Sequence, residues 1–273
     1  MSSPHMSTPQ LSLQLYSARQ ALEADQDTAL AKIAGLGLRH VEVFDFVRRS
    51  GELADALDRH GLTARTGHAE LLSVQRPDGT DVPTIEETFA AAERVGLDLV
   101  IDPFVPAPRW TDEREIARTA ALLNQAADRA ADHGLRVGYH NHSQEFVHTV
   151  NGSSAFEYFV SLLDPGVDLE IDLYWASAGG KDVVGLLERL GARVKALHVK
   201  DGAIIDDPFF SEAPFEPADT GQVAPGQGQV PLDAALAAAT SAEFAIIEFD
   251  HYSGDIFEGI EAAVRYLAAK GIA

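Results

Sequence analysis

The sequence predicts an α/β protein in which eight strand–helix units close into a single-domain (β/α)8 barrel, also called a TIM barrel. Short apolar runs alternate with amphipathic stretches along the chain, as parallel strands alternate with the helices that connect them. The 273 residues match the length of one such barrel, about 250 residues. No G-x-G-x-x-G motif follows the first apolar run, which disfavours the alternative of an open, doubly wound sheet that binds a dinucleotide.

Four strand–helix units are expected in the first half of the chain. Each apolar run has the length of a strand, and Asp or Gly residues mark the breaks between runs. The expected strands are residues 11–15, 40–44, 63–68 and 97–102. The expected helices that follow them are residues 28–35, 52–59, 84–95 and 111–133.

The second half of the chain repeats this pattern with one interruption. A stretch rich in Gly and Pro, residues 201–231, delays the seventh helix. It contains PFFSEAPF, whose apolar residues predict a lid over the barrel or an interface. The expected strands are residues 136–142, 167–172, 194–199 and 244–249, and the expected helices are residues 154–163, 183–190, 232–240 and 256–268.

The composition is that of a globular protein, with 46% hydrophobic and 23% charged residues. We expect residues 10–273 to form one domain, and the polar, non-periodic residues 1–9 to be disordered or tag-derived. No apolar run reaches the roughly 18 residues that span a bilayer, and the first residues lack the features of a secretory signal. These observations predict a cytoplasmic protein without a membrane partner.

The charge of the chain limits its ligands. Its 21 Lys and Arg residues against 42 Asp and Glu residues give a net charge of −21, which repels nucleic acid over most of the surface. No basic cluster or Gly-rich phosphate loop follows the seventh or eighth strand, which also disfavours phosphorylated substrates. The chain has no cysteine, so any metal must be held by nitrogen and oxygen ligands.

Candidate functional residues occur where the predicted strands end. In a barrel of this kind the functional side chains lie at the C-terminal ends of the strands. A polar residue there can also cap the next helix, but consecutive strand ends rich in His and carboxylate favour a site. The residues are His68 and Glu70 after the third strand, Asp102 at the fourth, His140, His142 and Glu145 at the fifth, Asp172 at the sixth, His198 and Lys200 at the seventh, and Glu248 at the eighth.

Four of these residues can form a metal site. Neighbouring strands of a closed barrel can bring Glu145, Asp172, His198 and Glu248 to one point above its mouth. Three carboxylates and one imidazole suit Mn²⁺, Mg²⁺ or Co²⁺ better than a structural zinc. The sequence therefore predicts a divalent metal cofactor, with Mn²⁺ expected and Mg²⁺, Co²⁺ and Zn²⁺ as alternatives.

Four segments of the chain resemble a known family. YHNHSQEF, LEIDLYW, ALHVKDG and IIEFD are similar to motifs of the xylose isomerase-like, or sugar phosphate isomerase/epimerase, superfamily of TIM barrels, and the resemblance covers nearly the whole chain. It implies metal ligands at Glu145, Asp172, His198 and Glu248. Many relatives place the first ligand at the end of the fifth strand itself, where this chain has His140 or His142, so His142 is the alternative ligand.

The resemblance also implies the chemistry. Such a metal holds adjacent hydroxyl and carbonyl oxygens of a sugar and stabilises the enediolate that forms when the α proton is removed. Glu145 and Glu248 are expected to transfer the proton on opposite faces of the sugar, with His142 as a second candidate base. Lys200 holds a substrate oxygen or pairs with Asp172 or Asp201. His68, Glu70, Asp102, His140 and Trp175 are expected to bind the substrate.

The expected function is therefore isomerisation or epimerisation of a free ketose or related polyol. A lyase or dehydratase acting on a keto-inositol or 3-keto-glycoside shares the first half-reaction and is the alternative. The DNA-repair endonuclease branch of the superfamily would need further metal ligands and a basic groove, which the charge disfavours. A non-catalytic sugar-binding barrel is the alternative from another class. Relatives often form dimers or tetramers, so a homo-oligomer is a further expectation.

Overall fold

The computed structural model describes residues 8–76, 79–211 and 215–273, and it confirms the predicted barrel. Most of the predicted N-terminal segment, residues 1–7, lies outside the described residues. Eight strands form the closed sheet: β1 (Gln10–Gln14), β2 (His40–Phe44), β3 (Thr63–His68), β4 (Leu99–Asp102), β5 (Arg136–His140), β8 (Asp168–Asp172), β9 (Val194–Val199) and β12 (Phe244–Ile247).

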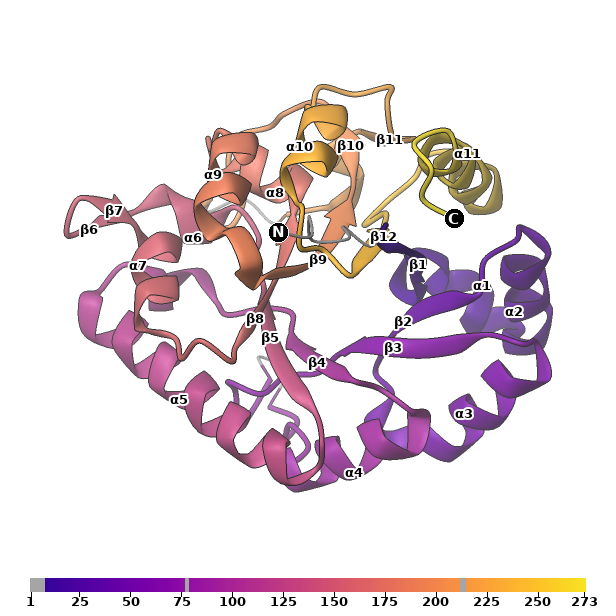
Figure 1. Cartoon of the computed structure of the whole chain (residues 1–273), viewed down its shortest axis with the longest axis horizontal. Coiled ribbons are helices and arrows are strands. Elements are labelled where there is room, and N and C mark those ends of the chain that lie inside the picture. The colour runs from indigo at the N-terminus through magenta and orange to yellow at the C-terminus, as the bar shows by residue number, and fades with distance from the viewer. Residues whose placement is uncertain (1–7, 77–78, 212–214) are drawn as a thin grey trace, which may run out of the picture.

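The strands pair in the order β1, β12, β9, β8, β5, β4, β3, β2, and each neighbouring pair is parallel (Figure 1). This is chain order around a closed ring, as the strand–helix alternation predicts. Two small antiparallel pairs lie outside the barrel. They are β6 (Thr149–Val150) with β7 (Ser153–Ser154), and β10 (Asp201–Gly202) with β11 (Gln222–Val223).

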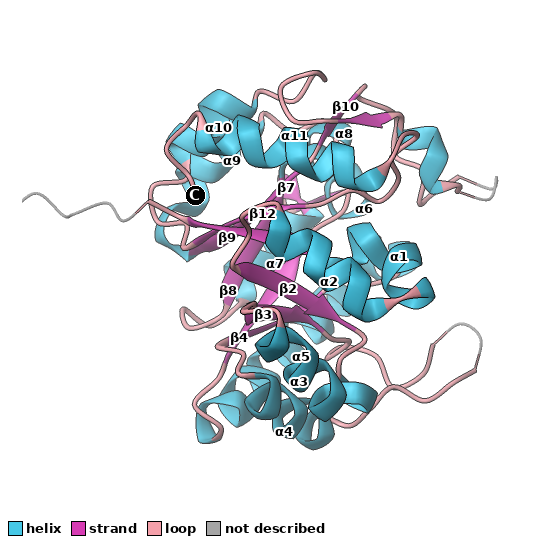
Figure 2. Ribbon diagram, turned by 90° about the vertical axis from the view of Figure 1, so that its right-hand side faces the viewer, coloured by secondary structure: helices cyan, strands magenta, loops and turns pink. Residues whose placement is uncertain are grey.

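Helices surround the barrel on its outside (Figure 2). Three short helices were not among the expected elements, because four to six residues are too few to show a helical period; they are α1 (Arg19–Ala24), α6 (Gln144–Val147) and α8 (Leu173–Ala178). The other helices are α2 (Gln26–Gly35), α3 (Ser50–Arg59), α4 (Ile85–Val95), α5 (Glu113–Asp132), α7 (Ala155–Leu162), α9 (Val183–Leu190), α10 (Leu232–Ala238) and α11 (Ile256–Ala268). Short 3₁₀ helices are η1 (Leu15–Ala18), η2 (Val47–Arg49), η3 (Ala107–Trp110), η4 (Gly191–Arg193) and η5 (Pro217–Thr220). None of the helices in the described part of the chain combines the length and apolarity needed to cross a bilayer.

Local chemistry determines where the long helices begin. Thr84 and Glu87 form a reciprocal capping box at the start of α4, and Gly96 ends that helix with a φ of 89°, a conformation that glycine adopts without strain. The carboxylate of Asp112 accepts hydrogen bonds from the backbone N–H groups of Arg114 and Glu115 at the start of α5. These caps satisfy N–H groups that have no partner within the helix.

The main apolar core lies between the sheet and the helices, where Phe89 of α4 and Phe159 of α7 are fully buried. Side chains alternate along each strand, so every second residue points into the barrel. Ala196, Phe244 and Ile246 form a separate small apolar cluster. Asp172 and Lys200 contact each other towards the C-terminal ends of their strands. The barrel thus carries buried polar residues towards the end where function is expected.

An ion-pair cluster joins the N-terminal ends of several strands. Arg136, the first residue of β5, has Nη1 2.9 Å from Oδ2 of Asp168, the first residue of β8. Its Nη2 lies 2.7 Å from Oε2 of Glu243, which precedes β12. Lys195 of β9 lies 3.7 Å from the other oxygen of Glu243. We call these four residues the Arg136 clamp; it lies at the end of the strands opposite the predicted site.

The long segment after β9 is organised by one carboxylate. Asp201 accepts hydrogen bonds from the backbone N–H groups of Gly226, Gly228 and Val230, at 2.8 to 3.1 Å. A side chain at Gly228 would collide with this carboxylate. Gly228 is therefore required by the close approach of the backbone to Asp201, and Asp201 is a structural residue of the loop.

Candidate active site

A cavity of about 670 Å³ opens among the loops that follow the C-terminal ends of the strands. Seven of the residues predicted from the sequence line it: His68, Glu70, His140, His142, Trp175, Lys200 and Glu248. Asp172 and His198 are fully buried and contact residues of this lining, since Asp172 pairs with Lys200 and His198 bonds Glu248. The structure thus gathers most of the predicted site residues at one end of the barrel.

The first group of potential ligands, which we call the upper group, consists of His140, Asp172, His198 and Glu248. One nitrogen or oxygen of each lies within 4.8 Å of the others. Nε2 of His140 is 3.7 Å from Oδ2 of Asp172, and Nδ1 of His198 contacts Oε2 of Glu248. Three of the four predicted metal ligands therefore come together, and the residue from the fifth strand that joins them is His140.

Glu145 does not join the upper group in this structure. Helix α6 begins at Gln144, directly after the turn that follows β5. Oε1 of Glu145 accepts a hydrogen bond from the Tyr139 hydroxyl at 2.7 Å, and Oε2 accepts one from the backbone N–H of His142 at 3.0 Å. Burial raises the pKa of Glu145 to about 8 despite these two hydrogen bonds. The side chain of Glu145 therefore holds the turn in place.

Lys200 lies among the carboxylates of the upper group. Its Nζ is 2.9 Å from Oδ2 of Asp172, 2.7 Å from Oε2 of Glu248 and 2.9 Å from Oδ2 of Asp250. Burial lowers the pKa of Lys200, but the three carboxylates outweigh this effect and raise that pKa well above its usual value. Of the two ion pairs considered for Lys200, the structure contains the one with Asp172; the carboxylate of Asp201 is bound to the backbone.

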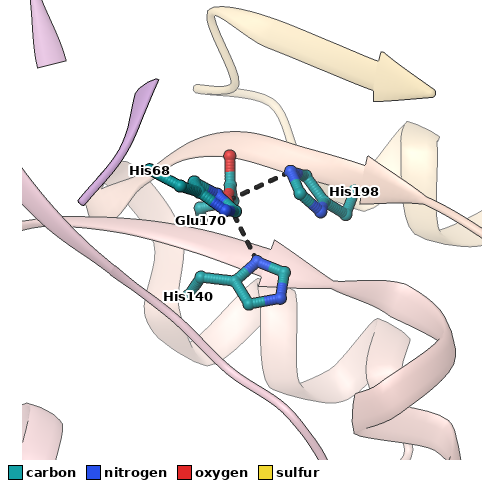
Figure 3. A group of neighbouring side chains, drawn as sticks. All are labelled: His68, His140, Glu170 and His198. Atoms are coloured by element: carbon teal, nitrogen blue, oxygen red, sulfur yellow. Dashed lines mark hydrogen bonds and ion pairs between the residues drawn. The ribbon is translucent and has the colours of Figure 1, made fainter. Parts of the chain in front are cut away.

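A second group, which we call the lower group, lies around Glu170. Oε2 of Glu170 is 2.7 Å from Nε2 of His68, 2.9 Å from Nδ1 of His140 and 3.1 Å from Nε2 of His198. Figure 3 shows this carboxylate among the three imidazoles. The ligand atoms of these four residues also lie within 4.8 Å of one another.

Glu42 supports the lower group. Its Oε1 accepts a hydrogen bond from Nε2 of Gln14 at 2.8 Å, and it lies 2.7 Å from Nε2 of His198 and 3.1 Å from Nε2 of His68. Burial lowers the pKa of His68, but Glu42 and Glu170 outweigh burial and raise that pKa to about 10. A charged His68 therefore balances part of the negative charge of Glu42 and Glu170.

The upper and lower groups share two histidines through different nitrogens. His140 presents Nδ1 to Glu170 and Nε2 to Asp172. His198 presents Nε2 to Glu170 and Glu42, and Nδ1 to Glu248. A carboxylate that accepts the N–H of one ring nitrogen leaves the other nitrogen available for a metal and fixes the direction of the ring. Glu170 has this relation to both histidines of the upper group.

Glu42 and Glu170 were not predicted as site residues. Each is a charged residue within a short apolar strand, in HVEVF and DLEID, and Glu170 precedes Asp172 by two positions, on the same side of the strand. A charged residue at an inward position of a buried strand needs a partner. That pattern is the signal that could have identified both.

The remaining predicted pocket residues have separate roles. Oε2 of Glu70 lies 2.7 Å from the guanidinium of Arg76, and both residues line the cavity. Asp102 does not line it. Its carboxylate accepts hydrogen bonds from the backbone N–H groups of Leu71, Leu72 and Phe104, and burial raises its pKa to about 6. Asp102 thus holds the loops after β3 and β4.

The arrangement has the donors that a divalent cation requires. The upper group offers two carboxylates and two imidazoles, and oxygen and nitrogen ligands of these types bind Zn²⁺, Mn²⁺ and Co²⁺. Oδ2 of Asp172 is buried and has no aligned hydrogen bond with any described residue. Nζ of Lys200 lies 2.9 Å from this oxygen and also contacts Asp250.

Comparison with known proteins agrees with the fold. A family model described as "xylose isomerase-like TIM barrel" matches residues 30–270. An inosose dehydratase of Lacticaseibacillus casei is 30% identical over 99 residues, which is 36% of this chain and 32% of that protein. The match thus spans about a third of the length of this curated relative.

Solved structures of the same architecture cover nearly the whole chain. A sugar phosphate isomerase/epimerase from Parabacteroides distasonis superposes with a TM-score of 0.73 at 23% identity, covering 98% of this chain and 96% of that one. The IolI protein with a bound zinc atom superposes with a TM-score of 0.69 at 18% identity, covering 95% and 97% of the two chains. At these identities the two structures support the fold.

Proposed function

The chain belongs to the xylose isomerase-like TIM-barrel family, and from that premise we propose that it is a metal-dependent isomerase or epimerase of a ketose or related polyol. The observation that carries the proposal is the position of the upper group at the cavity. Glu248, Lys200 and His142 line that cavity together, so metal ligands, a cation and a neutral base all face the same bound molecule.

The proposed ligands are His140, Asp172, His198 and Glu248. Their ligand atoms lie within 4.8 Å of one another, and Asp172 offers an oxygen without an aligned hydrogen bond to any described residue. A divalent cation bound there supplies a Lewis acid that polarises the carbonyl of the sugar. Two imidazoles with two carboxylates suit Zn²⁺ as well as Mn²⁺, and a zinc-binding relative of the same fold exists.

The proposed proton-transfer groups are Glu248 and His142. Burial keeps the pKa of His142 well below its usual value, so the ring is a neutral base, and its Nδ1 has no hydrogen-bond partner among the described residues. Burial raises the pKa of Glu248, but Lys200 and His198 outweigh it and keep this carboxylate ionised. Both side chains line the cavity, whereas Glu145 does not. Lys200 is positioned to hold a substrate oxygen.

A lyase or dehydratase is the second candidate function. It is favoured by the match to an inosose dehydratase over 99 residues. Elimination next to a carbonyl begins with the same removal of an α proton. The two functions differ in the next step, in which His142 returns the proton to carbon or gives it to a departing oxygen.

The test is proton exchange with solvent. The Mn²⁺- or Zn²⁺-loaded protein is incubated in deuterated water with ketoses, keto-inositols and 3-keto-glycosides, and C–H exchange and products are followed by NMR. We expect exchange that requires the metal and is lost in Glu248→Gln but kept in Glu258→Gln, a change of an exposed residue on α11. An isomeric product supports the first function, and an eliminated group supports the second. No exchange with any compound would contradict both and favour a sugar-binding barrel.

A further inference from the structure

We propose that the cavity contains a second subsite, which binds an uncharged aromatic group attached to the polyol. This inference rests on the proposed function for the position of the sugar, beside the upper group. The subsite is formed by five aromatic side chains that line the cavity: Phe104, His142, Trp175, Phe209 and Phe215. We call these residues the aromatic wall.

The aromatic wall is continuous although its residues come from four separate segments. Phe104 follows β4, His142 follows β5, Trp175 belongs to α8, and Phe209 and Phe215 follow β10. The Phe209 ring is at its centre. Its centroid lies 5.7 Å from that of Phe104, 5.4 Å from His142, 5.3 Å from Trp175 and 5.5 Å from Phe215. These separations are those of favourable aromatic pairs.

The size of the cavity indicates an occupant larger than one sugar. Its volume of about 670 Å³ lies within the range of about 300–1,000 Å³ found for drug-sized ligands. A single sugar ring beside His140, His142 and Glu248 does not fill a cavity of this size. Rings that stand next to a polyol site favour a ligand with a flat apolar part.

Two polar atoms within the aromatic wall lack a hydrogen-bond partner among the described residues. They are Nε1 of Trp175 and Nδ1 of His142, and both are buried. A buried polar group without a hydrogen bond is costly, and an acceptor on a bound ligand would offset that cost. An aromatic ligand with an ether or hydroxyl oxygen can accept the indole N–H.

The charge of the cavity indicates an uncharged occupant. Four carboxylates line it, those of Asp45, Glu70, Glu248 and Asp250, against the two cations Arg76 and Lys200. Arg76 pairs with Glu70, and Lys200 pairs with Glu248 and Asp250. Among the described residues, both of these cations are therefore already paired, and neither is free to bind an anionic substituent of the aryl group. The substrate class that fits is a neutral aryl glycoside or an aryl-substituted polyol.

The indole signals of the protein test the subsite directly. The chain has two tryptophans, so ¹⁵N-labelled protein gives two indole N–H resonances. Trp110 is buried beside Tyr139 and Phe159 and donates its N–H to the carbonyl of Val105, which makes its resonance an internal reference. We expect phenyl β-glucoside to shift the Trp175 resonance alone and to bind about tenfold more tightly than methyl β-glucoside.

Phe209 and Phe210 provide a matched pair of variants. Phe209 lies in the aromatic wall, whereas Phe210 does not line the cavity and its ring contacts His148. We expect Phe209→Ala to abolish the preference for the phenyl compound and Phe210→Ala to retain it. An unshifted Trp110 resonance shows that each variant is folded, and Phe209→Leu replaces Phe209→Ala if it is not.

The outcomes separate this inference from the proposed function. Equal affinity for the two glucosides, no shift of the Trp175 resonance, or a preference that survives Phe209→Ala would each overturn the subsite. If ketoses exchange protons but the aryl preference is absent, the subsite fails alone. If the aryl preference is present in Glu248→Gln and in the natural protein while no compound exchanges protons, the subsite stands and the proposed reaction fails.

Discussion

At the scale of single residues, the structure differs from the sequence-based prediction in the fifth-strand residue that joins the other proposed metal ligands. The sequence predicted Glu145, and the structure has His140 there. His140 presents Nε2 to Asp172, and the Glu145 carboxylate is occupied by Tyr139 and the His142 N–H. We therefore expect His140→Ala to weaken Zn²⁺ or Mn²⁺ binding by at least about 100-fold and Glu145→Gln to change it only a few-fold. Isothermal titration of the metal-free proteins measures both. If Glu145→Gln loses as much affinity as His140→Ala, Glu145 turns to the metal on binding.

The contacts of Glu170 lead to a second prediction at this scale. It accepts contacts from both His140 and His198, whereas Glu42, within the described part of the chain, contacts His198 and not His140. We expect Glu170→Gln to weaken metal binding by about 10–100-fold and Glu42→Gln to weaken it less, because only one ligand loses its partner. Calorimetric titration with each metal gives the ranking. Unchanged affinity in Glu170→Gln would show that the lower group does not position the ligands.

How much of the site could be predicted depends on where each residue lies relative to its strand. Asp172, His198 and Glu248 end or follow apolar strands, where barrel geometry brings side chains together, and the structure does bring them together. Glu145 lies beyond the strand, and its direction depends on where α6 begins, which the sequence does not specify. Glu170 lies inside a strand, two positions before Asp172 and on the same side, so the sequence did carry a signal for it, although it does not end the strand.

At the scale of elements, one carboxylate joins three segments of the chain. Glu157 accepts a hydrogen bond from the Ser154 hydroxyl at the start of α7, and it also binds Lys181, which precedes α9, and Arg189 of α9. Burial raises the pKa of Glu157, but Ser154, Lys181 and Arg189 outweigh it and lower that pKa to about 2. The carboxylate therefore contributes stability above its unfolded pKa, and this contribution is lost as the pH falls through about 2.

We expect Glu157→Gln to lower the free energy of unfolding by about 1 kcal/mol at pH 7, a modest value because the group is partly exposed to solvent. The difference from the natural protein should shrink between about pH 4.5 and pH 2 as Glu157 is protonated. Urea unfolding at several pH values measures it. Glu188→Gln, at an exposed position of the same helix α9, should have little effect. A difference that is constant with pH would contradict the ionic explanation.

Elements differ in how far they could be predicted. The long helices α4, α5 and α11 carry a clear helical period and capping residues, so their existence and approximate bounds were predicted. The segment after β9 could not be predicted, since its path depends on backbone N–H groups that converge on Asp201. The expectation that it forms a lid or an interface stays a prediction.

At the scale of the whole molecule, the closed barrel was predicted because chain-wide alternation has few other solutions. The closed barrel has groups of polar residues at both ends of its strands. The upper and lower groups and the aromatic wall lie towards the C-terminal ends of the strands, and the Arg136 clamp ties together the N-terminal ends of β5 and β8 and the residue before β12.

The Arg136 clamp shares no residue with the cavity lining. Mutations of the aromatic wall therefore remove none of the residues of the clamp, while they change the shape of the cavity. In evolutionary terms, the sequence of each of these loops can change independently of the Arg136 clamp. A descendant of this chain could acquire a different substrate by altering Phe104, Phe209 or Phe215, one loop at a time, without first having to reinvent the scaffold that supports them.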